Sequence, residues 1–116
     1  MVWPDSTALD GMPAIHLSYQ LAADSAHGRF APAGDAWVAA WVRDPSLVLY
    51  EPDNIHPAAD GTYLAALTIF GVVFDRSPIG LPASVRTPDG VTYQLSPARA
   101  RLLQEAAAAA IAAGGG

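Results

Sequence analysis

The chain has 116 residues, of which 52% are hydrophobic and 15% are charged, and its formal net charge at neutral pH is −5. This length allows at most one domain, and the composition argues against an intrinsically disordered chain. The acidic balance and the scattered arginines argue against a nucleic-acid partner. The sequence has no cysteine, which excludes disulfides, thiolate metal sites and a cysteine nucleophile.

Residues 1–6 lack the basic and apolar regions of a signal peptide, so the sequence as written predicts a cytoplasmic protein. The longest apolar run, residues 63–74, is shorter than the roughly 20 residues that cross a bilayer, which argues against a membrane span. Val2 and Trp3 are typical of the end of a strand, and Pro4 interrupts them at once. We therefore expect this chain to begin inside a larger domain.

The first predicted helix covers residues 14–26 and follows a loop over residues 4–13. His27 and Gly28 are expected to end it, as a basic residue in the last turn and a glycine just beyond. Its apolar positions recur at spacings of three and four: Ile15, Tyr19, Ala22 and Ala26.

A short strand and a second helix are predicted next. The strand candidate covers residues 29–33 and should end at Pro32, because proline cannot donate to a sheet ladder. The helix covers residues 35–43. Asp35 suits its positive N-terminal end, and Arg43 suits its negative C-terminal end.

The longest predicted helix covers residues 58–74 and is apolar on nearly every side, so we expect it to lie inside a domain or against a sheet. Gly61 would let it approach a neighbour closely. Two extended pieces within residues 84–95 then flank a turn over residues 87–90. Ser96 should cap the last, alanine-rich helix. The order of elements predicts an α/β fold, predominantly helical, with few parallel strands.

A short polar loop separates the second and third helices and holds the best candidate site residues. Asp53 stands three residues before His56, between Pro52 and Pro57. Histidine is the side chain suited to taking a proton near neutral pH, and a carboxylate can hold its ring in one tautomer. This spacing lets Asp53 fold back onto one ring nitrogen of His56 while the other nitrogen faces outward.

The loop belongs to a longer set of residues with a recognisable order: Asp53-Asn54-Ile55-His56-Pro57, Gly61-Thr62-Tyr63-Leu64-Ala65-Ala66, Arg76-Ser77-Pro78 and, upstream, Gly34-Asp35-Ala36-Trp37. This set resembles the C-terminal part of the SGNH (GDSL-type) serine hydrolases, which include esterases and lipases. The resemblance implies that residues 1–82 are the C-terminal portion of a three-layer α/β/α domain, incomplete here. Residues 83–116 would be a hairpin-like turn and a helix that pack on the same domain.

The resemblance also implies a chemistry, in which Asp53 orients His56 as the general base for a serine that attacks an ester carbonyl, with no cofactor. In the family that serine lies in a Gly-Asp-Ser block far ahead of the histidine, and two intermediate blocks supply oxyanion donors. This sequence contains none of the three blocks. One oxyanion donor alone is worth about 10²–10³ in rate, so we expect little or no esterase activity from this chain by itself.

Two other hypotheses stay open. Ser6, in the sequence Pro4-Asp5-Ser6, imitates the Gly-Asp-Ser block and would be the nucleophile of a very small complete enzyme, although it lies close in sequence to the His56 loop. Alternatively, the chain is a non-catalytic helical interaction module derived from the family. Missing strands would leave apolar faces bare, so we expect homo-oligomers or aggregation.

The remaining polar and aromatic residues indicate a function less clearly than Asp53 and His56 do. The three histidines lack metal-ligand spacing, so no metal site is expected: His16, His27 and His56. Four carboxylates could in principle pair as the acid and base of a glycosidase: Asp5, Asp10, Glu51 and Asp53. Trp37 and Trp41 fall four apart on a helix and are expected in a core or an interface, or else as the lining of a substrate pocket.

Overall fold

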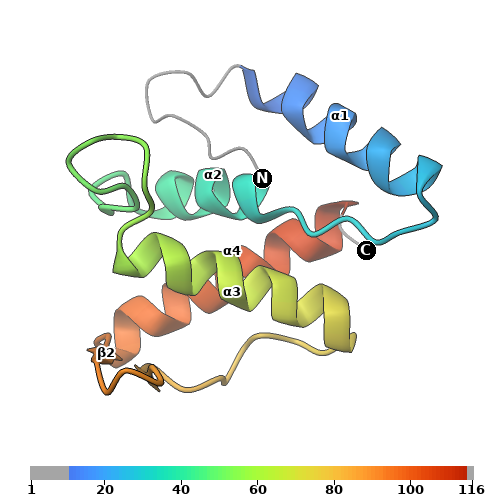
Figure 1. Cartoon of the computed structure of the whole chain (residues 1–116). Coiled ribbons are helices and arrows are strands. Elements are labelled where there is room, and N and C mark those ends of the chain that lie inside the picture. The colour runs from blue at the N-terminus through green and yellow to red at the C-terminus, as the bar shows by residue number, and fades with distance from the viewer. Residues whose placement is uncertain (1–10, 115–116) are drawn as a thin grey trace.

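The structure is a computed structural model that describes residues 11–114, and these fold into four helices and one two-stranded hairpin (Figure 1). The elements in chain order are α1 (Met12–Ser25), α2 (Ala33–Arg43), α3 (Ala59–Phe74), β1 (Ser84–Arg86), β2 (Thr92–Gln94) and α4 (Pro97–Gly114). The described part of the chain is therefore predominantly helical with a small sheet. The four expected helices and the expected hairpin are confirmed, with bounds that differ by at most two residues at the helix ends.

The expectation of parallel strands is wrong for the described residues. Strands β1 and β2 are antiparallel, with Val85 opposite Tyr93, and the turn that joins them closes where Gly90 donates its N–H to the Thr87 carbonyl. Residues 29–33 are not a strand, because the Ala31 carbonyl accepts a hydrogen bond from the nearby Ala33 N–H instead of from a neighbouring strand. Val2 and Trp3 lie outside the described residues.

Helix α1 ends at Ser25, so His27 lies beyond its last turn and not in it as expected, and His27 rather than Gly28 takes a left-handed conformation. His27 has φ 54°, and this conformation turns the chain so that the Gly28 N–H donates to the Ala23 carbonyl at 2.8 Å. The helix lies along the α2 side of the molecule (Figure 1).

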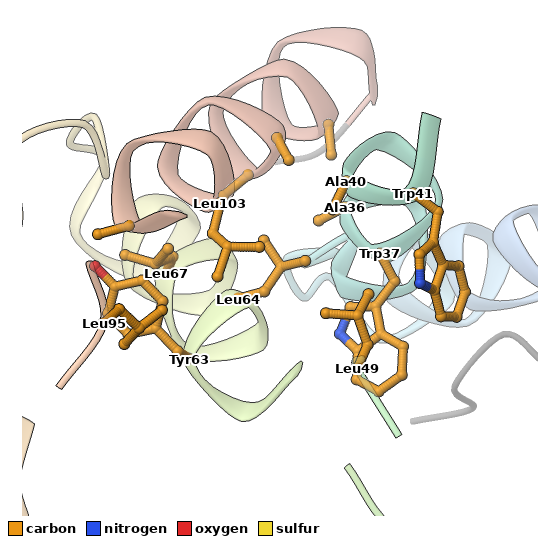
Figure 2. Close-up of a cluster of buried hydrophobic side chains, with 14 residues drawn as sticks. Ala36, Trp37, Ala40, Trp41, Leu49, Tyr63, Leu64, Leu67, Leu95 and Leu103 are labelled. Atoms are coloured by element: carbon orange, nitrogen blue, oxygen red, sulfur yellow. The ribbon is translucent and has the colours of Figure 1, made fainter. Parts of the chain in front are cut away.

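The core lies where α2, α3 and α4 meet (Figure 2). Its centre is formed by fully buried large side chains, one each from α2, α3 and α4 and one from the segment after α2: Trp37, Leu64, Leu103 and Leu49. The alanine tract of α4 presents its small side chains to the neighbouring helices, and Ala106 and Ala107 are completely buried. Truncating one large core side chain to alanine typically costs about 2–5 kcal/mol, so these few contacts dominate the stability of a chain this small.

Glycine at the start of α3 allows a close approach between segments in this core. A Cβ atom placed on Gly61 would lie 2.3 Å from the Leu49 carbonyl oxygen and 2.6 Å from the Trp37 ring. The expectation that Gly61 lets this helix approach a neighbour is confirmed. Helix α3 is less enclosed than expected, because its outer face leaves Ile69, Val73 and Phe74 exposed.

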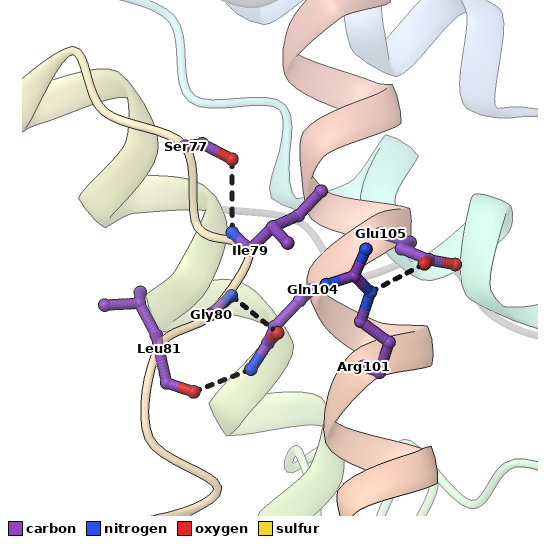
Figure 3. A network of polar contacts seen from close by, with 7 residues as sticks. All are labelled: Ser77, Ile79, Gly80, Leu81, Arg101, Gln104 and Glu105. Carbon is purple, nitrogen blue, oxygen red and sulfur yellow. Dashed lines mark hydrogen bonds and ion pairs between the residues drawn. The ribbon is translucent and has the colours of Figure 1, made fainter.

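A buried amide ties the segment after α3 to α4 (Figure 3). The Gln104 side chain donates to the Leu81 carbonyl at 2.8 Å and accepts from the Gly80 N–H at 2.9 Å. The same amide donates to the Tyr63 hydroxyl, which in turn donates to the Pro82 carbonyl. This network fixes the path of the chain around residue 82, and the hairpin and α4 follow it onto the same core.

Within residues 11–114, no helix is both long enough and apolar enough to cross a bilayer.

Replacing Gly61 with alanine tests the close approach at the start of α3. Alanine normally favours a helix over glycine by up to about 1 kcal/mol, but here the added methyl group meets a backbone carbonyl that cannot move aside cheaply. We expect Gly61→Ala to lower the free energy of unfolding by about 1–3 kcal/mol. Urea denaturation followed by circular dichroism measures this.

The matched control is Gly28→Ala, because a Cβ there would meet nothing closer than the Ala23 carbonyl at 3.8 Å. We expect it to change stability by less than about 0.5 kcal/mol. Equal stability of the Gly61→Ala and parent proteins would mean that α3 does not touch the Leu49 segment as described.

Candidate functional site

The loop between α2 and α3 is closed at its base by backbone hydrogen bonds. Tyr50 and Pro57 form an antiparallel bridge, and the Glu51 N–H donates to the His56 carbonyl at 2.7 Å. Just below the bridge, the Ala58 N–H donates to the Leu49 carbonyl at 2.8 Å. The loop is therefore a short hairpin whose two ends are held together by backbone hydrogen bonds alone.

The aromatic core holds the base of this hairpin in place. The Tyr50 ring meets the buried Trp37 ring edge to face, with centroids 4.9 Å apart, and lies 6.3 Å from the ring of Trp41. Trp41 donates its indole N–H to the Leu47 carbonyl at 3.0 Å, which fixes the segment that leads into the loop. The two tryptophans on α2 are thus core residues, and Trp41 also lines a hollow described below.

Asp53 organises the tip of the hairpin with both carboxylate oxygens. Its Oδ1 atom accepts from the N–H groups of Ile55 and His56, each at 3.0 Å. Its Oδ2 atom lies 2.5 Å from Nδ1 of His56. Asn54 takes a left-handed conformation, φ 58°, which an asparagine tolerates better than most residues. The expected pairing of Asp53 with His56 is therefore present in the geometry.

The hydrogen bonds of this pair change how both side chains titrate. The hydrogen bond from His56, followed by those from the Ile55 and His56 N–H groups, lowers the pKa of Asp53 from 3.8 to about 2. The same side-chain hydrogen bond, assisted by the carboxylate charge, raises the pKa of His56 above 6.5. A carboxylate that accepts Nδ1–H leaves Nε2 as the basic nitrogen of the neutral ring, which is the arrangement that a general base needs.

Both shifts make the stability of the loop depend on pH. The pKa of His56 is raised on folding, so its stabilising effect is complete below about pH 6.5 and is lost as the pH rises through the raised value. The pKa of Asp53 is lowered on folding, so its effect is present above about pH 3.8 and is lost as the pH falls toward 2. Both side chains of the ion pair are therefore charged between about pH 3.8 and pH 6.5.

The pair lies at the molecular surface. The side chain of His56 is 74% exposed and that of Asp53 is 44% exposed. Among residues 11–114, no serine hydroxyl lies within hydrogen-bond distance of His56; the Ser18 hydroxyl, for example, donates to the Ala14 carbonyl on α1. Ser6, the other nucleophile considered, lies outside the described residues. The described chain thus brings together an acid and a base, and no nucleophile with them.

A shallow hollow of about 450 Å³ opens beside the loop. Glu51 and Asn54 line it from the loop, and Trp41, Leu47 and Tyr50 supply aromatic and apolar walls. This volume falls within the range of small-molecule sites. Asp53 and His56 do not line the hollow, and Glu51 and Asn54 are the loop residues that connect it to the pair.

The remaining expected candidates do not gather into a site. In the part of the chain that the structure describes, no three His, Asp or Glu side chains lie close enough to share a metal ion. The proposed carboxylate pairs with Asp5 and Asp10 fall outside the described residues. Glu51 contributes to the raised pKa of His56 through its charge, and only after Asp53.

A second histidine–carboxylate pair, which the sequence did not predict, lies between α1 and α2. Nδ1 of His16 lies 2.8 Å from Oδ2 of Asp35, and each side chain is 32% exposed. The two residues are 19 positions apart, so no local sequence motif indicates that they pair. A signal was present in the helical spacing, because Met12, His16 and Ala23 lie on the α1 face that is turned toward α2.

Comparison with known proteins gives no family model, no curated protein and no solved structure that matches this chain.

The titration of His56 tests the pairing directly. We expect NMR of the imidazole Cε1 proton to give a pKa above 6.5 in the parent chain, because Asp53 favours the protonated ring. Asp53→Asn should bring the pKa of His56 back toward 6.5. Glu51→Gln should lower it less, since Glu51 acts through its charge without a hydrogen bond. An unchanged titration in Asp53→Asn would contradict the described geometry.

Proposed function

We propose that Asp53 and His56 are the acid–base half of a serine ester hydrolase site of the SGNH type, and that the serine comes from outside the described residues. The observation that carries the proposal is the bond between Asp53 and Nδ1 of His56, which leaves Nε2 exposed and basic. The resemblance of residues 34–37, 53–57, 61–66 and 76–78 to that family supports it. On this proposal residues 1–82 are the C-terminal portion of a three-layer α/β/α domain.

The proposed reaction is acyl transfer in two steps. Nε2 of His56 takes the proton of the serine hydroxyl as the serine oxygen attacks the carbonyl carbon of an ester. His56 then returns this proton to the leaving alcohol, and the acyl-serine remains. Water attacks the acyl group in the second step, again through His56, and releases the acid and the free serine. Throughout, the Asp53 carboxylate offsets the charge that forms on the ring.

The hollow beside the loop favours an ester with an apolar portion. Its walls come from Trp41, Leu47 and Tyr50, and its one carboxylate, on Glu51, belongs to the loop itself. An anionic substrate would meet no cation there, since arginine does not line this hollow.

A second function is supported by a different observation, the apolar side chains on the outer faces of two helices. Leu17 and Leu21 on α1 are each 56% exposed, and Val73 and Phe74 on α3 are 56% and 62% exposed. Exposed rows of this kind mark interaction surfaces in many proteins. A non-catalytic helical module that associates through α3 is therefore the alternative.

Activity measurements on two forms of the protein test the hydrolase proposal. The 116-residue chain should give little or no turnover of p-nitrophenyl acetate and no labelling by a fluorophosphonate, because a base without the serine and the oxyanion donors does not make an acyl-serine. The DNA upstream of the Met1 codon should encode an in-frame Gly-Asp-Ser block. A protein that includes this block should hydrolyse the ester.

In that longer protein, His56→Ala and Asp53→Asn should each lower kcat by about 10⁴-fold or more. The control is His27→Asn, which removes an exposed histidine and keeps a residue that tolerates the left-handed conformation. It should leave kcat unchanged. Fluorophosphonate labelling of the 116-residue chain that disappears in Ser6→Ala would contradict the proposal and assign the nucleophile to Ser6.

The association state tests the alternative function. We expect sedimentation of the 116-residue chain to show oligomers, and the double variant Val73→Lys/Phe74→Lys to shift it toward monomer, because two charges would be forced into the apolar contact. Val42→Lys is the control, since Val42 is 76% exposed but lies on α2. A monomeric parent chain would remove the support for association through α3.

A further inference from the structure

The pair His16 and Asp35 takes no part in the proposed hydrolase site, and its position between helices differs from that of the loop pair. Asp35 lies in the first turn of α2, and His16 lies in the second turn of α1. The His16 ring is also held by an edge contact with Phe30, with centroids 4.8 Å apart. Two independent contacts therefore fix the ring, whereas the exposed His56 ring is fixed by one.

The ring of His16 stands at the boundary of a hollow of about 660 Å³ between α1, α2 and α4. Apart from His16 and Asp35, the lining is uncharged and includes Val38, Ala39, Ala110 and Ala113. Ligand sites commonly combine apolar walls with a small number of fixed polar groups, and this hollow has that composition.

The free nitrogen of the ring faces this hollow. Nδ1 is engaged by Asp35, and a Cβ placed on Gly114, which lines the hollow, would lie 3.4 Å from Cε1 and 3.6 Å from Nε2 of His16. The edge of the ring that carries Nε2 is therefore the edge presented to the hollow.

The charges around the ring decide which ligand chemistry fits. Asp35 accepts Nδ1–H, so the neutral ring offers Nε2 as a hydrogen-bond acceptor, which matches a hydroxyl donor. A carboxylate or phosphate would meet the negative charge of Asp35, and no arginine lines this hollow, since Arg29 lines the smaller hollow that His16 and Asp35 also border.

We propose that the hollow between α1, α2 and α4 is a second binding site, for a small apolar molecule that carries a hydroxyl group, with the hydroxyl donating to Nε2 of His16. Asp35 is a positioning residue in this site, since it acts through the tautomer of the ring. The proposal is independent of the hydrolase reaction at His56.

The test is an NMR titration of the full 116-residue chain with 1-hexanol. We expect saturable shifts of His16, Val38 and Ala113, and ¹⁵N shifts of the neutral His16 ring that identify Nδ1 as the protonated nitrogen. Hexyl methyl ether, which has no hydroxyl donor, should bind about tenfold more weakly, since one hydrogen bond is lost. Hexanoate should also bind more weakly than hexanol.

Three variants separate recognition from folding. His16→Phe keeps an aromatic ring against Phe30 and removes Nε2, so hexanol should lose its advantage over the ether. Asp35→Asn should weaken hexanol binding and change the ¹⁵N tautomer signature of His16. Ala113→Leu fills the hollow and should reduce binding of hexanol and the ether alike, whereas the control His27→Asn should change neither.

The proposal would be overturned by an absence of saturable shifts with hexanol, by equal binding of hexanol and the ether, or by tighter binding of hexanoate. Shifts that persist unchanged in both His16→Phe and Ala113→Leu would place the alcohol elsewhere on the protein and would also overturn it.

Discussion

The contact between the Trp37 ring and the start of α3 is the constraint on which the rest of this structure depends. Trp37 is fully buried, and Gly61 lies so close to it and to the Leu49 carbonyl that no side chain fits between them. The same ring makes an edge-to-face contact with Tyr50, the residue at the base of the acid–base hairpin. One aromatic side chain thus joins α2, α3 and the loop that connects them, and it sets where Asp53 and His56 emerge at the surface.

The two histidine–carboxylate pairs contain the same chemical groups but lie in different surroundings. At the loop, a single carboxylate organises three backbone or ring N–H groups within three residues, and the pair stands in solvent. Between α1 and α2, the pair is built from residues far apart in sequence and borders an apolar hollow. A surface pair suits a base that must meet a nucleophile from elsewhere, whereas a pair set in apolar walls suits recognition of a small ligand.

Much of the local structure could be predicted from the sequence, because it rests on short-range rules. The spacing of apolar residues predicted the helices. Ser96 predicted the start of α4, where its hydroxyl accepts a hydrogen bond from the Arg99 N–H. The three-residue spacing of Asp53 and His56 predicted the bond between their side chains. The strand expected at residues 29–33 failed because a strand is defined by its neighbour, which a single segment does not contain. The His16–Asp35 pair was missed for the same reason, since it depends on how α1 packs on α2.

The hairpin that carries Asp53 and His56 is closed by its own bonds, from the Tyr50–Pro57 bridge at its base to the Asx-type turn at its tip. Eight consecutive residues therefore encode the whole arrangement of acid and base. Such a hairpin is a self-contained unit that suits transfer to another protein. Grafted onto another scaffold with an aromatic platform beneath residue 50, it should keep its internal geometry, and a protein engineer could combine it with nucleophiles of unrelated origin.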